Sequence, residues 1–281
     1  MRVANLAGRL VLVEGDLALD VERSSGTFSS DPQAVYERWD EFQAWAATAP
    51  VTHGEPFDRR QLRSPAPSPR QIFAVGLNYR DHVDEVGLAH GVPVVFTKYV
   101  SSIAGPYDDI PHPGGDVDWE VELVAVLARG GRDIREEDAW DYVVGLTIGQ
   151  YISERITQHV GVTPQFSLGK SYPNFAPMGP MLVTPDEFDD PDDIALETIV
   201  NGDIVQSSRT SFMTSSVSRL IAQLSSITTL LPGDAIFTGT PSGVGLGMVP
   251  PRYLNVGDEL VTRIEGVGEL HNRIVEGRVS A

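Results

Sequence analysis

Short apolar runs separated by Gly and Pro dominate this chain, and the spacing within them predicts mostly strands. Near the N-terminus, RLVLVEG (9–15) and DLALDV (16–21) predict two strands joined by a Gly-Asp turn. Ser30, Asp31 and Pro32 then predict the start of a helix, because these residue types favour its first positions. Apolar residues follow at helical spacing, at positions 35, 39, 42 and 46.

The segment RSPAPSPR, residues 63–70, is a Pro- and Ser-rich linker. It predicts a division into a small N-terminal α/β region, residues 1–68, and a larger domain, residues 69–281. In the larger domain, strands are predicted at 71–79, 94–100, 119–128, 142–149, 194–202, 235–240 and 259–266.

Two amphipathic helices are predicted between these strands, near 136–142 and 215–228. The second has an apolar stripe made of Leu220, Ile221, Leu224 and Ile227. Strands dominate, and few strand–helix–strand units are regular. The pattern therefore predicts an α+β, mainly β fold rather than a doubly wound parallel sheet.

The composition argues against several classes of partner. The 281 residues are 41% hydrophobic, which is enough for a substantial core. A net charge of −18 disfavours nucleic acid and anionic membranes, since both attract basic surfaces. The absence of cysteine excludes disulfides and thiolate metal ligands. The N-terminal residues lack a secretory apolar core and no stretch is long enough to span a bilayer, so we expect a soluble cytoplasmic protein.

The lysines are unusually few. Of the 21 basic residues, only Lys98 and Lys170 are lysines, and the others are Arg. Lysines that persist against such a bias can mark positions that need a compact ammonium rather than a guanidinium fork. Chance is the alternative explanation.

Two groups of residues carry candidate chemistry. Glu120 and Glu122 lie two apart in DWEVELV, so on a strand both carboxylates point to one face. A bound Mg²⁺, Mn²⁺ or Ca²⁺, or basic neighbours, would offset their repulsion; a solvated strand face is the alternative. His82 and Glu85 lie one helical turn apart, which lets the carboxylate orient the imidazole as a general base. By itself, this spacing fits a surface pair equally well.

Two Gly-rich loops follow. GKSYPNFAPMGP (169–180) holds Lys170, and IFTGTPSGVG (236–245) holds the hydroxyls of Thr238 and Thr240. The second loop lacks the Lys and the spacing of a phosphate-binding loop, so we expect neither a nucleotide nor another organic cofactor.

The order of these segments resembles the fumarylacetoacetate hydrolase family over about residues 70 to 277. The motifs that carry the resemblance are GLNYxxHxxE, FxK, DWExEL, GxTxxxxxSxRxxQ, GKS…PMGP, VNG…Q, LxPGDxIxTGTPxGVG and LxxGD…IEGxGxLxN. The resemblance implies a mixed β-sandwich roll, often homodimeric, and Mg²⁺ or Mn²⁺. It also implies C–C bond cleavage in acylpyruvates and β-diketones, decarboxylation or tautomerisation of oxaloacetate-like acids, or isomerisation of dienoic diacids.

Carried over motif by motif, the resemblance implies a role for each matching residue. Glu120 and Glu122 match metal ligands, and His82 with Glu85 matches a base on a loop that closes over substrate. The remaining matches are substrate-binding or catalytic groups: Lys98, Arg155, Gln158, Lys170 and Thr240.

The pattern breaks at Tyr151, where the family's third metal ligand is an Asp. A phenol is neutral at pH 7, so this change removes a charge and a hard-cation ligand. On a strand, Glu154 points to the opposite face from Tyr151 and does not replace the ligand, whereas a turn in this segment would allow it to. We therefore expect a metal site that is weak or absent, with Tyr151 available as a catalytic proton donor.

Three functions remain open. The first is hydrolysis of a C–C bond in a 1,3-dicarbonyl or 2-oxo acid, by water that His82 and Glu85 activate. The second is a metal-independent isomerase, decarboxylase or cyclase in a specialised, biosynthetic pathway. The third is a non-catalytic relative that binds a small acid, which is the least favoured because the chain keeps the set of matching residues.

Overall fold

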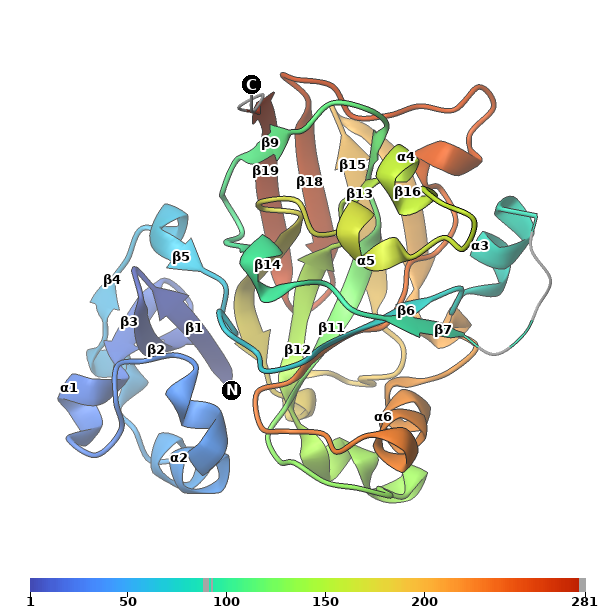
Figure 1. Cartoon of the computed structure of the whole chain (residues 1–281). Coiled ribbons are helices and arrows are strands. Elements are labelled where there is room, and N and C mark those ends of the chain that lie inside the picture. The colour runs from blue at the N-terminus through green and yellow to red at the C-terminus, as the bar shows by residue number, and fades with distance from the viewer. Residues whose placement is uncertain (88–90, 92, 278–281) are drawn as a thin grey trace.

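The computed structural model describes residues 1–87, 91 and 93–277 of the chain. Strands outnumber helices throughout, so the predicted α+β, mainly β fold is confirmed (Figure 1). No helix among these residues is both long and apolar enough to cross a membrane.

Most strands of the described residues belong to one twelve-stranded sheet. Its main path runs β4 (Glu55–Pro56), β3 (Leu17–Asp20), β2 (Arg9–Glu14), β1 (Arg2–Leu6), β14 (Ala176–Val183), β12 (Val143–Gln150), β11 (Val121–Leu127), β17 (Ala235–Phe237), β6 (Ile72–Gly76) and β7 (Val94–Phe96). Two short strands lie off this path: β5 (Leu62–Arg63) pairs with β1, and β8 (Ile103–Ala104) pairs with β14.

A second, five-stranded sheet of the described residues has the order β16 (Asp203–Arg209), β15 (Ala195–Val200), β18 (Glu259–Ile264), β19 (Gly268–Glu276) and β9 (Ile110–His112). A small ribbon pairs β10 (Val117–Asp118) with β13 (Ser153–Glu154). The α-helices are α1 (Val21–Ser25), α2 (Trp39–Ala46), α3 (Arg80–Glu85), α4 (Arg155–Gln158), α5 (Phe166–Gly169) and α6 (Val217–Ile227). The 3₁₀ turns are η1 (Ala34–Arg38), η2 (Val51–His53), η3 (Arg59–Gln61), η4 (Val100–Ser102), η5 (Glu136–Tyr142), η6 (Pro185–Glu187), η7 (Thr210–Phe212) and η8 (Gly245–Gly247).

Strand β11 lies in the centre of the large sheet and is buried along its whole length. Its side chains alternate between two cores: Leu123 and Ala125 pack into one, Val124 and Val126 into the other. The first core also includes side chains of β15, β18 and α6. A strand covered on both faces explains why VELVAVL is a nearly continuous apolar run.

Several predictions differ from the structure. Strands β1, β14, β16 and β19 were not predicted, and the segment 136–142 forms the 3₁₀ turn η5 rather than an α-helix. The helix predicted at 215–228 is confirmed as α6, but Ile227 is 80% exposed and lies outside its apolar stripe. Ile227 is the last residue of α6, where the helix already leaves the core.

The N-terminal region joins the rest of the chain through the large sheet. Strand β1 pairs antiparallel with β14, with Val3 opposite Leu182. In Figure 1 this region, with α1 and α2, forms the blue part on the left. The boundary at residue 68 stays a prediction.

The topology brings four strand ends to one edge of the sheet. β6 and β17 run parallel, so their carboxyl ends lie together. β11 runs antiparallel to β17 and to β12, so its first residues meet the carboxyl ends of β17 and β12. The loops that leave these ends carry α3, the TGTP segment and α4, and all of them meet beside Glu120 and Glu122.

Candidate active site

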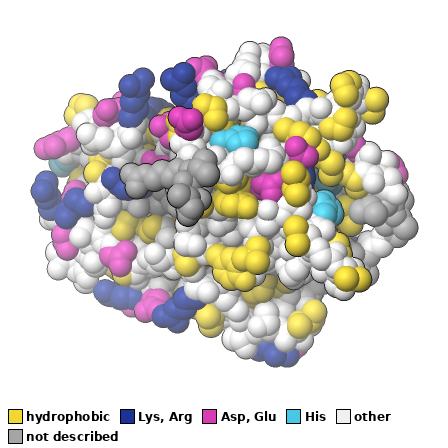
Figure 2. All heavy atoms as spheres, turned by 45° about the horizontal axis from the view of Figure 1, so that its top comes forward, with side chains coloured by type: hydrophobic (Ala, Val, Ile, Leu, Met, Phe, Trp, Pro, Cys, Tyr) yellow, Lys and Arg dark blue, Asp and Glu magenta, His cyan; other side chains and the backbone are white. Residues whose placement is uncertain are grey.

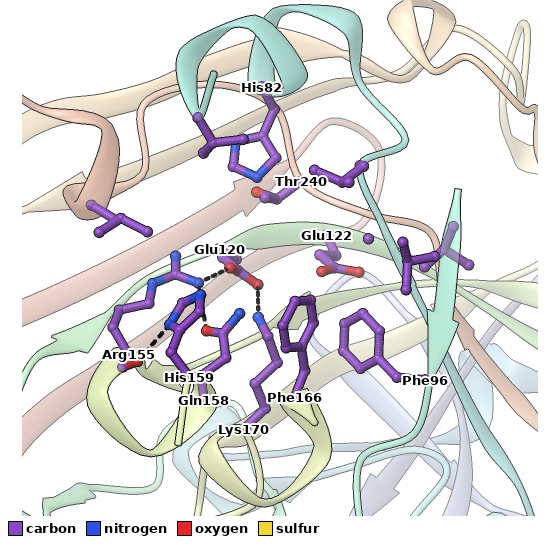
Figure 3. Close-up of a pocket in the computed structure, with 16 residues that line it drawn as sticks. His82, Phe96, Glu120, Glu122, Arg155, Gln158, His159, Phe166, Lys170 and Thr240 are labelled. Atoms are coloured by element: carbon purple, nitrogen blue, oxygen red, sulfur yellow. Dashed lines mark hydrogen bonds and ion pairs between the residues drawn. The ribbon is translucent and has the colours of Figure 1, made fainter. Parts of the chain in front are cut away.

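A cavity of about 250 Å³ lies at this edge of the large sheet (Figure 3). Glu120 and Glu122 both line it, which confirms that the two carboxylates share one face. The other polar residues that line it are His82, Arg155, Gln158, His159, Lys170 and Thr240. Of the sequence-predicted site residues, the structure therefore brings seven to the cavity wall, whereas Glu85, Lys98 and Tyr151 do not line it.

Glu120 is held between two cations. Arg155 Nη1 donates to its Oε1 at 2.7 Å, and Lys170 Nζ donates to its Oε2 at 2.7 Å. Burial alone would raise the pKa of the Glu120 carboxyl, but the charges of Lys170 and Arg155 outweigh burial and lower the pKa to about 2. Both oxygens of this carboxylate are therefore already paired.

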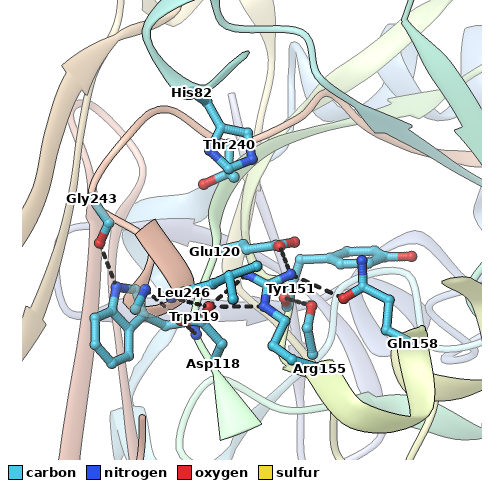
Figure 4. A network of polar contacts seen from close by, with 12 residues as sticks. His82, Asp118, Trp119, Glu120, Tyr151, Arg155, Gln158, Thr240, Gly243 and Leu246 are labelled. Atoms are coloured by element: carbon cyan, nitrogen blue, oxygen red, sulfur yellow. Dashed lines mark hydrogen bonds and ion pairs between the residues drawn. The ribbon is translucent and has the colours of Figure 1, made fainter. Parts of the chain in front are cut away.

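Asp118 holds Arg155 in place, and sequence reasoning missed it. Its Oδ2 accepts from Arg155 Nε at 2.9 Å and Nη2 at 2.7 Å (Figure 4). Backbone N–H groups of Gly245 and Leu246 also donate to Asp118, which ties the β17 loop to the same cluster. A carboxylate next to the E-x-E pattern in DWEVELV was the available signal.

Glu122 is less well compensated. The backbone N–H of Gly239 donates to its Oε2 at 2.8 Å, and no described Lys or Arg forms an ion pair with it. Gly239 has φ of +99°, and a Cβ there would lie 2.8 Å from the Val75 carbonyl, so this close approach needs glycine. Burial, with the charge of Glu120 added, raises the pKa of Glu122 to about 8.

His82 and Glu85 form the predicted pair on α3. Nδ1 of His82 lies 3.0 Å from Glu85 Oε2, and the other oxygen of Glu85 accepts from the Gly243 N–H at 2.8 Å. Ser242 donates to Asp81 on the same helix. Figure 3 shows the imidazole of His82 facing the cavity, on the side opposite Lys170 and Arg155.

The substrate-facing donors come from the other wall. Lys170 Nζ also donates to Ser153 Oγ at 2.6 Å, so two of its three N–H bonds are used among the described residues. Gln158 Oε1 accepts from Arg155 Nη1 at 3.0 Å. Thr240 Oγ1 accepts from Gln206 at 2.8 Å, which leaves its O–H free to donate.

Lys98 and Tyr151 pack against each other behind the cavity. Lys98 Nζ donates to the carbonyls of Ile152 and Phe175 and lies 3.6 Å from the centroid of the Tyr151 ring. Among the described residues the Tyr151 hydroxyl has no hydrogen-bond partner, and burial raises its pKa well above the ordinary value. These contacts favour structural roles over the predicted substrate-binding role of Lys98 and catalytic role of Tyr151.

The donor set does not fit a resident divalent cation. Across the described part of the chain, no three His, Asp or Glu side chains gather in a geometry that could hold a metal ion. Glu154 caps α4 through the N–H groups of Ile156 and Thr157, so its carboxylate is engaged away from Glu120 and Glu122. A cation at Glu120 would have to displace Arg155 or Lys170.

Comparison with known proteins agrees with this arrangement of segments. The family model described as fumarylacetoacetate (FAA) hydrolase C-terminal matches residues 71–275. The chain belongs to this family. A mitochondrial oxaloacetate tautomerase of Xenopus laevis is 42% identical over 217 residues, which cover 76% of this chain and 68% of that protein.

Solved structures of this family have the same fold. A protein from Mycobacterium smegmatis is 54% identical, covers 98% of this chain and 99% of its own, and superposes with a TM-score of 0.94. Maleylpyruvate hydrolase from a Sphingobium species, in complex with manganese and pyruvate, is 28% identical, covers 99% of this chain and all of its own, and has a TM-score of 0.80. Members of the family are enzymes, and this chain is one of them.

Sequence reasoning also missed the aromatic part of the cavity. Phe96 and Phe166 line one side of it, and His159 lies beside them. Phe96 belongs to the FxK motif and Phe166 precedes GKS, but no spacing pattern in the sequence links the two. Only the folded chain brings them together.

Proposed function

We propose that this enzyme moves a proton at the carbon beside a carbonyl group of a 2-oxo acid or 1,3-dicarbonyl compound, without a resident divalent metal ion. The relative named oxaloacetate tautomerase supports the reaction class, and the pyruvate bound to the Sphingobium hydrolase supports a 2-oxo acid. Homodimerisation and a cytoplasmic location stay predictions.

One observation carries this proposal. The imidazole of His82, with Nδ1 bonded to Glu85, faces the cluster of Arg155, Glu120 and Lys170 across the cavity (Figure 3). If Nδ1 carries the proton that bonds Glu85, Nε2 is left as the basic nitrogen. A base on one wall and cationic donors on the other is the arrangement that enolate formation needs.

The proton balance of the step is simple. His82 Nε2 takes a proton from the carbon next to the carbonyl group. The electron pair of that C–H bond forms the enolate, with its charge on the carbonyl oxygen. The third N–H of Lys170 and the remaining N–H of Arg155 stabilise that oxygen, and Lys170 gives it a proton. Exchange with solvent then restores both groups, so the mass of the substrate is unchanged.

The charges of the buried side chains around Glu120 argue against a resident divalent cation. The ion pairs of the buried cluster join two carboxylates, Asp118 and Glu120, to two cations, Arg155 and Lys170. Burial raises the pKa of Glu122 to about 8 and lowers that of Lys98, so it favours the uncharged form of both. Added to a balanced cluster in a low-dielectric site, a dication would be unfavourable. Tyr151 contributes no charge to attract one.

Hydrolysis of a C–C bond is the second candidate, and the same His82–Glu85 pair favours it. His82 would take a proton from water, and the water oxygen would attack the carbonyl carbon. The adjacent C–C bond would break, and its electron pair would form the enolate that Lys170 and Arg155 stabilise. The proton held by His82 would then pass to the enolate carbon. The products would together be one water heavier than the substrate.

The decisive experiment follows both reactions in enzyme treated with chelator. Loss of the enol form of acetylpyruvate reports proton transfer, and ¹⁸O incorporation from labelled water into its cleavage products reports hydrolysis. We expect proton transfer, reduced about 100-fold or more in His82→Gln. His271→Gln is the matched control, because His271 forms an exposed pair with Glu269 away from the cavity.

Three outcomes would refute parts of this proposal. Equal rates in wild type and His82→Gln would refute the role of the base. Activity that disappears with chelator and returns with Mn²⁺ would refute the metal-independent site. Product labelled with ¹⁸O at the rate of overall turnover would replace proton transfer with hydrolysis.

A further inference from the structure

Two half-buried phenylalanines form an aromatic wall on one side of the cavity. The rings of Phe96 and Phe166 meet edge to face with centroids 5.4 Å apart, and the His159 ring lies 5.9 Å beyond Phe166. In Figure 3 the two phenyl rings lie next to Lys170, on the side away from Arg155. The two phenyl rings therefore lie beside Lys170, within reach of a substrate bound at that ammonium group.

Apolar side chains line other parts of the cavity as well. Val75, Leu77, Val86, Val94 and Leu246 also line the cavity. Val94 is 44% exposed, which leaves a large apolar side chain open to water at the mouth of the cavity. An apolar ligand group placed here would remove this surface from water.

The cations of the cavity are already committed. Among the described residues that line the cavity, Arg155 and Lys170 are the only Arg and Lys. Both form ion pairs with Glu120. They can each still offer an N–H to one oxo acid group. A second carboxylate would find no further Lys or Arg among the described residues that line the cavity.

We infer that the substrate is a 2-oxo acid or 1,3-dicarbonyl compound with an uncharged, apolar tail, preferably aromatic, that packs against Phe96, Phe166 and His159. This inference rests on the proposed function and specifies its substrate. It differs from what the relatives' names suggest, since oxaloacetate and maleylpyruvate are both diacids.

Tyr151 extends the aromatic wall into the core. Its ring lies 6.1 Å from that of Phe96 and 5.1 Å from that of Phe237. Phe96 is thereby supported from behind by an aromatic ring. Tyr151, at the position where the resemblance implies a metal ligand, thus provides packing for an apolar tail.

The first test uses the wild-type enzyme and three substrates: benzoylpyruvate with a phenyl tail, acetylpyruvate with a methyl tail, and oxaloacetate with a carboxylate. We expect kcat/KM to be at least tenfold higher for benzoylpyruvate than for acetylpyruvate, as for burial of an aromatic ring, and lowest for oxaloacetate. This comparison needs no variant and so cannot fail through misfolding.

The second test measures the ratio of kcat/KM for benzoylpyruvate to that for acetylpyruvate. We expect Phe96→Ala and Phe166→Ala each to lower this ratio about tenfold. Phe212→Ala is the matched control, because Phe212 is 62% exposed and does not line the cavity, and its ratio should stay at the wild-type value. Phe166→Arg should shift the preference toward oxaloacetate by adding a free cation.

The outcomes separate this inference from the proposed function. Turnover in which oxaloacetate is the best substrate would overturn the inference and leave the proposed function standing. An unchanged ratio in both Phe→Ala variants would also overturn it. No turnover of any of the three substrates would refute the proposed function and this inference together.

Discussion

Replacing Arg155 with Met removes the guanidinium that joins two buried carboxylates, while most of the side-chain length remains. Arg155 is 6% exposed, and its side chain donates to Asp118 at 2.7 and 2.9 Å and to Glu120 at 2.7 Å. Because the carboxylates stay behind, the variant is expected to lose far more stability than a surface pair contributes.

The size of the stability loss depends on the hydrogen-bond donors that each carboxylate retains in the variant. Breaking a buried ion pair by removing one partner costs about 3–5 kcal/mol. Asp118 keeps N–H donors from Trp119, Gly245 and Leu246, and Glu120 keeps Lys170. We therefore expect the lower end, about 3 kcal/mol, which corresponds to a drop in Tm of about 6–12 °C for a chain of this size.

Urea and thermal unfolding of Arg155→Met measure this loss. Arg263→Met is the matched control, since Arg263 is half exposed and pairs with Glu269 at 3.1 Å, and it should change stability by less than about 1 kcal/mol. Adding Asp118→Asn to Arg155→Met should recover part of the loss, because it removes one uncompensated charge. Equal stabilities of Arg155→Met and Arg263→Met would refute the reasoning.

Two further predictions concern single buried groups. Glu122→Gln keeps an acceptor for the Gly239 N–H but cannot ionise. The pKa of Glu122 is raised from 4.5 to about 8, so the wild type loses stability as the pH rises through this window and the variant does not. Urea titrations should show the variant more stable by at least about 1 kcal/mol at pH 8 and equal to wild type near pH 4; a difference independent of pH would contradict this. Lys98→Met leaves two carbonyls without a donor and should cost about 2 kcal/mol in urea, while kcat/KM of the folded enzyme changes less than twofold. A KM that rises tenfold would instead place Lys98 in substrate binding.

The sequence allowed the fold class to be predicted because the buried strands have distinctive patterns. VELVAVL and ALETIV were recognisable, the first as a continuous apolar run and the second by alternation. Strand β14, APMGPMLV, was not, because its Pro and Gly residues are typical of turns. It is nevertheless fully buried, since tertiary pairing with β12 and β1 overrides local preference.

The site was predicted unevenly for a similar reason. Residues within one motif, such as His82 and Glu85, have a geometry that their spacing largely determines. Contacts between motifs depend on strand order, which the pattern did not provide. Asp118, Phe96, Phe166 and His159 were missed on this ground. The predicted role of Lys98 in substrate binding stays a prediction, and in the structure its Nζ donates to two backbone carbonyls.

Tyr151 connects the two proposals and provides the strictest test of both. Tyr151→Asp would introduce a third carboxylate and remove the ring that supports Phe96. We expect this variant to gain a rise in Tm with millimolar Mn²⁺ that the wild type lacks, and to lose most of its preference for a phenyl tail. Tyr151→Phe is the control: it removes only a buried hydroxyl without a described partner, so stability and tail preference should be unchanged or slightly higher. If Tyr151→Asp bound Mn²⁺ but kept the preference for a phenyl tail, the proposed support of Phe96 by Tyr151 would be refuted. The proposal that the wild type lacks a metal because residue 151 offers no carboxylate would remain. If the wild type responded to Mn²⁺ as strongly as the variant, the ion pairs of Glu120 would have to open for the metal, and the metal-independent site would be refuted.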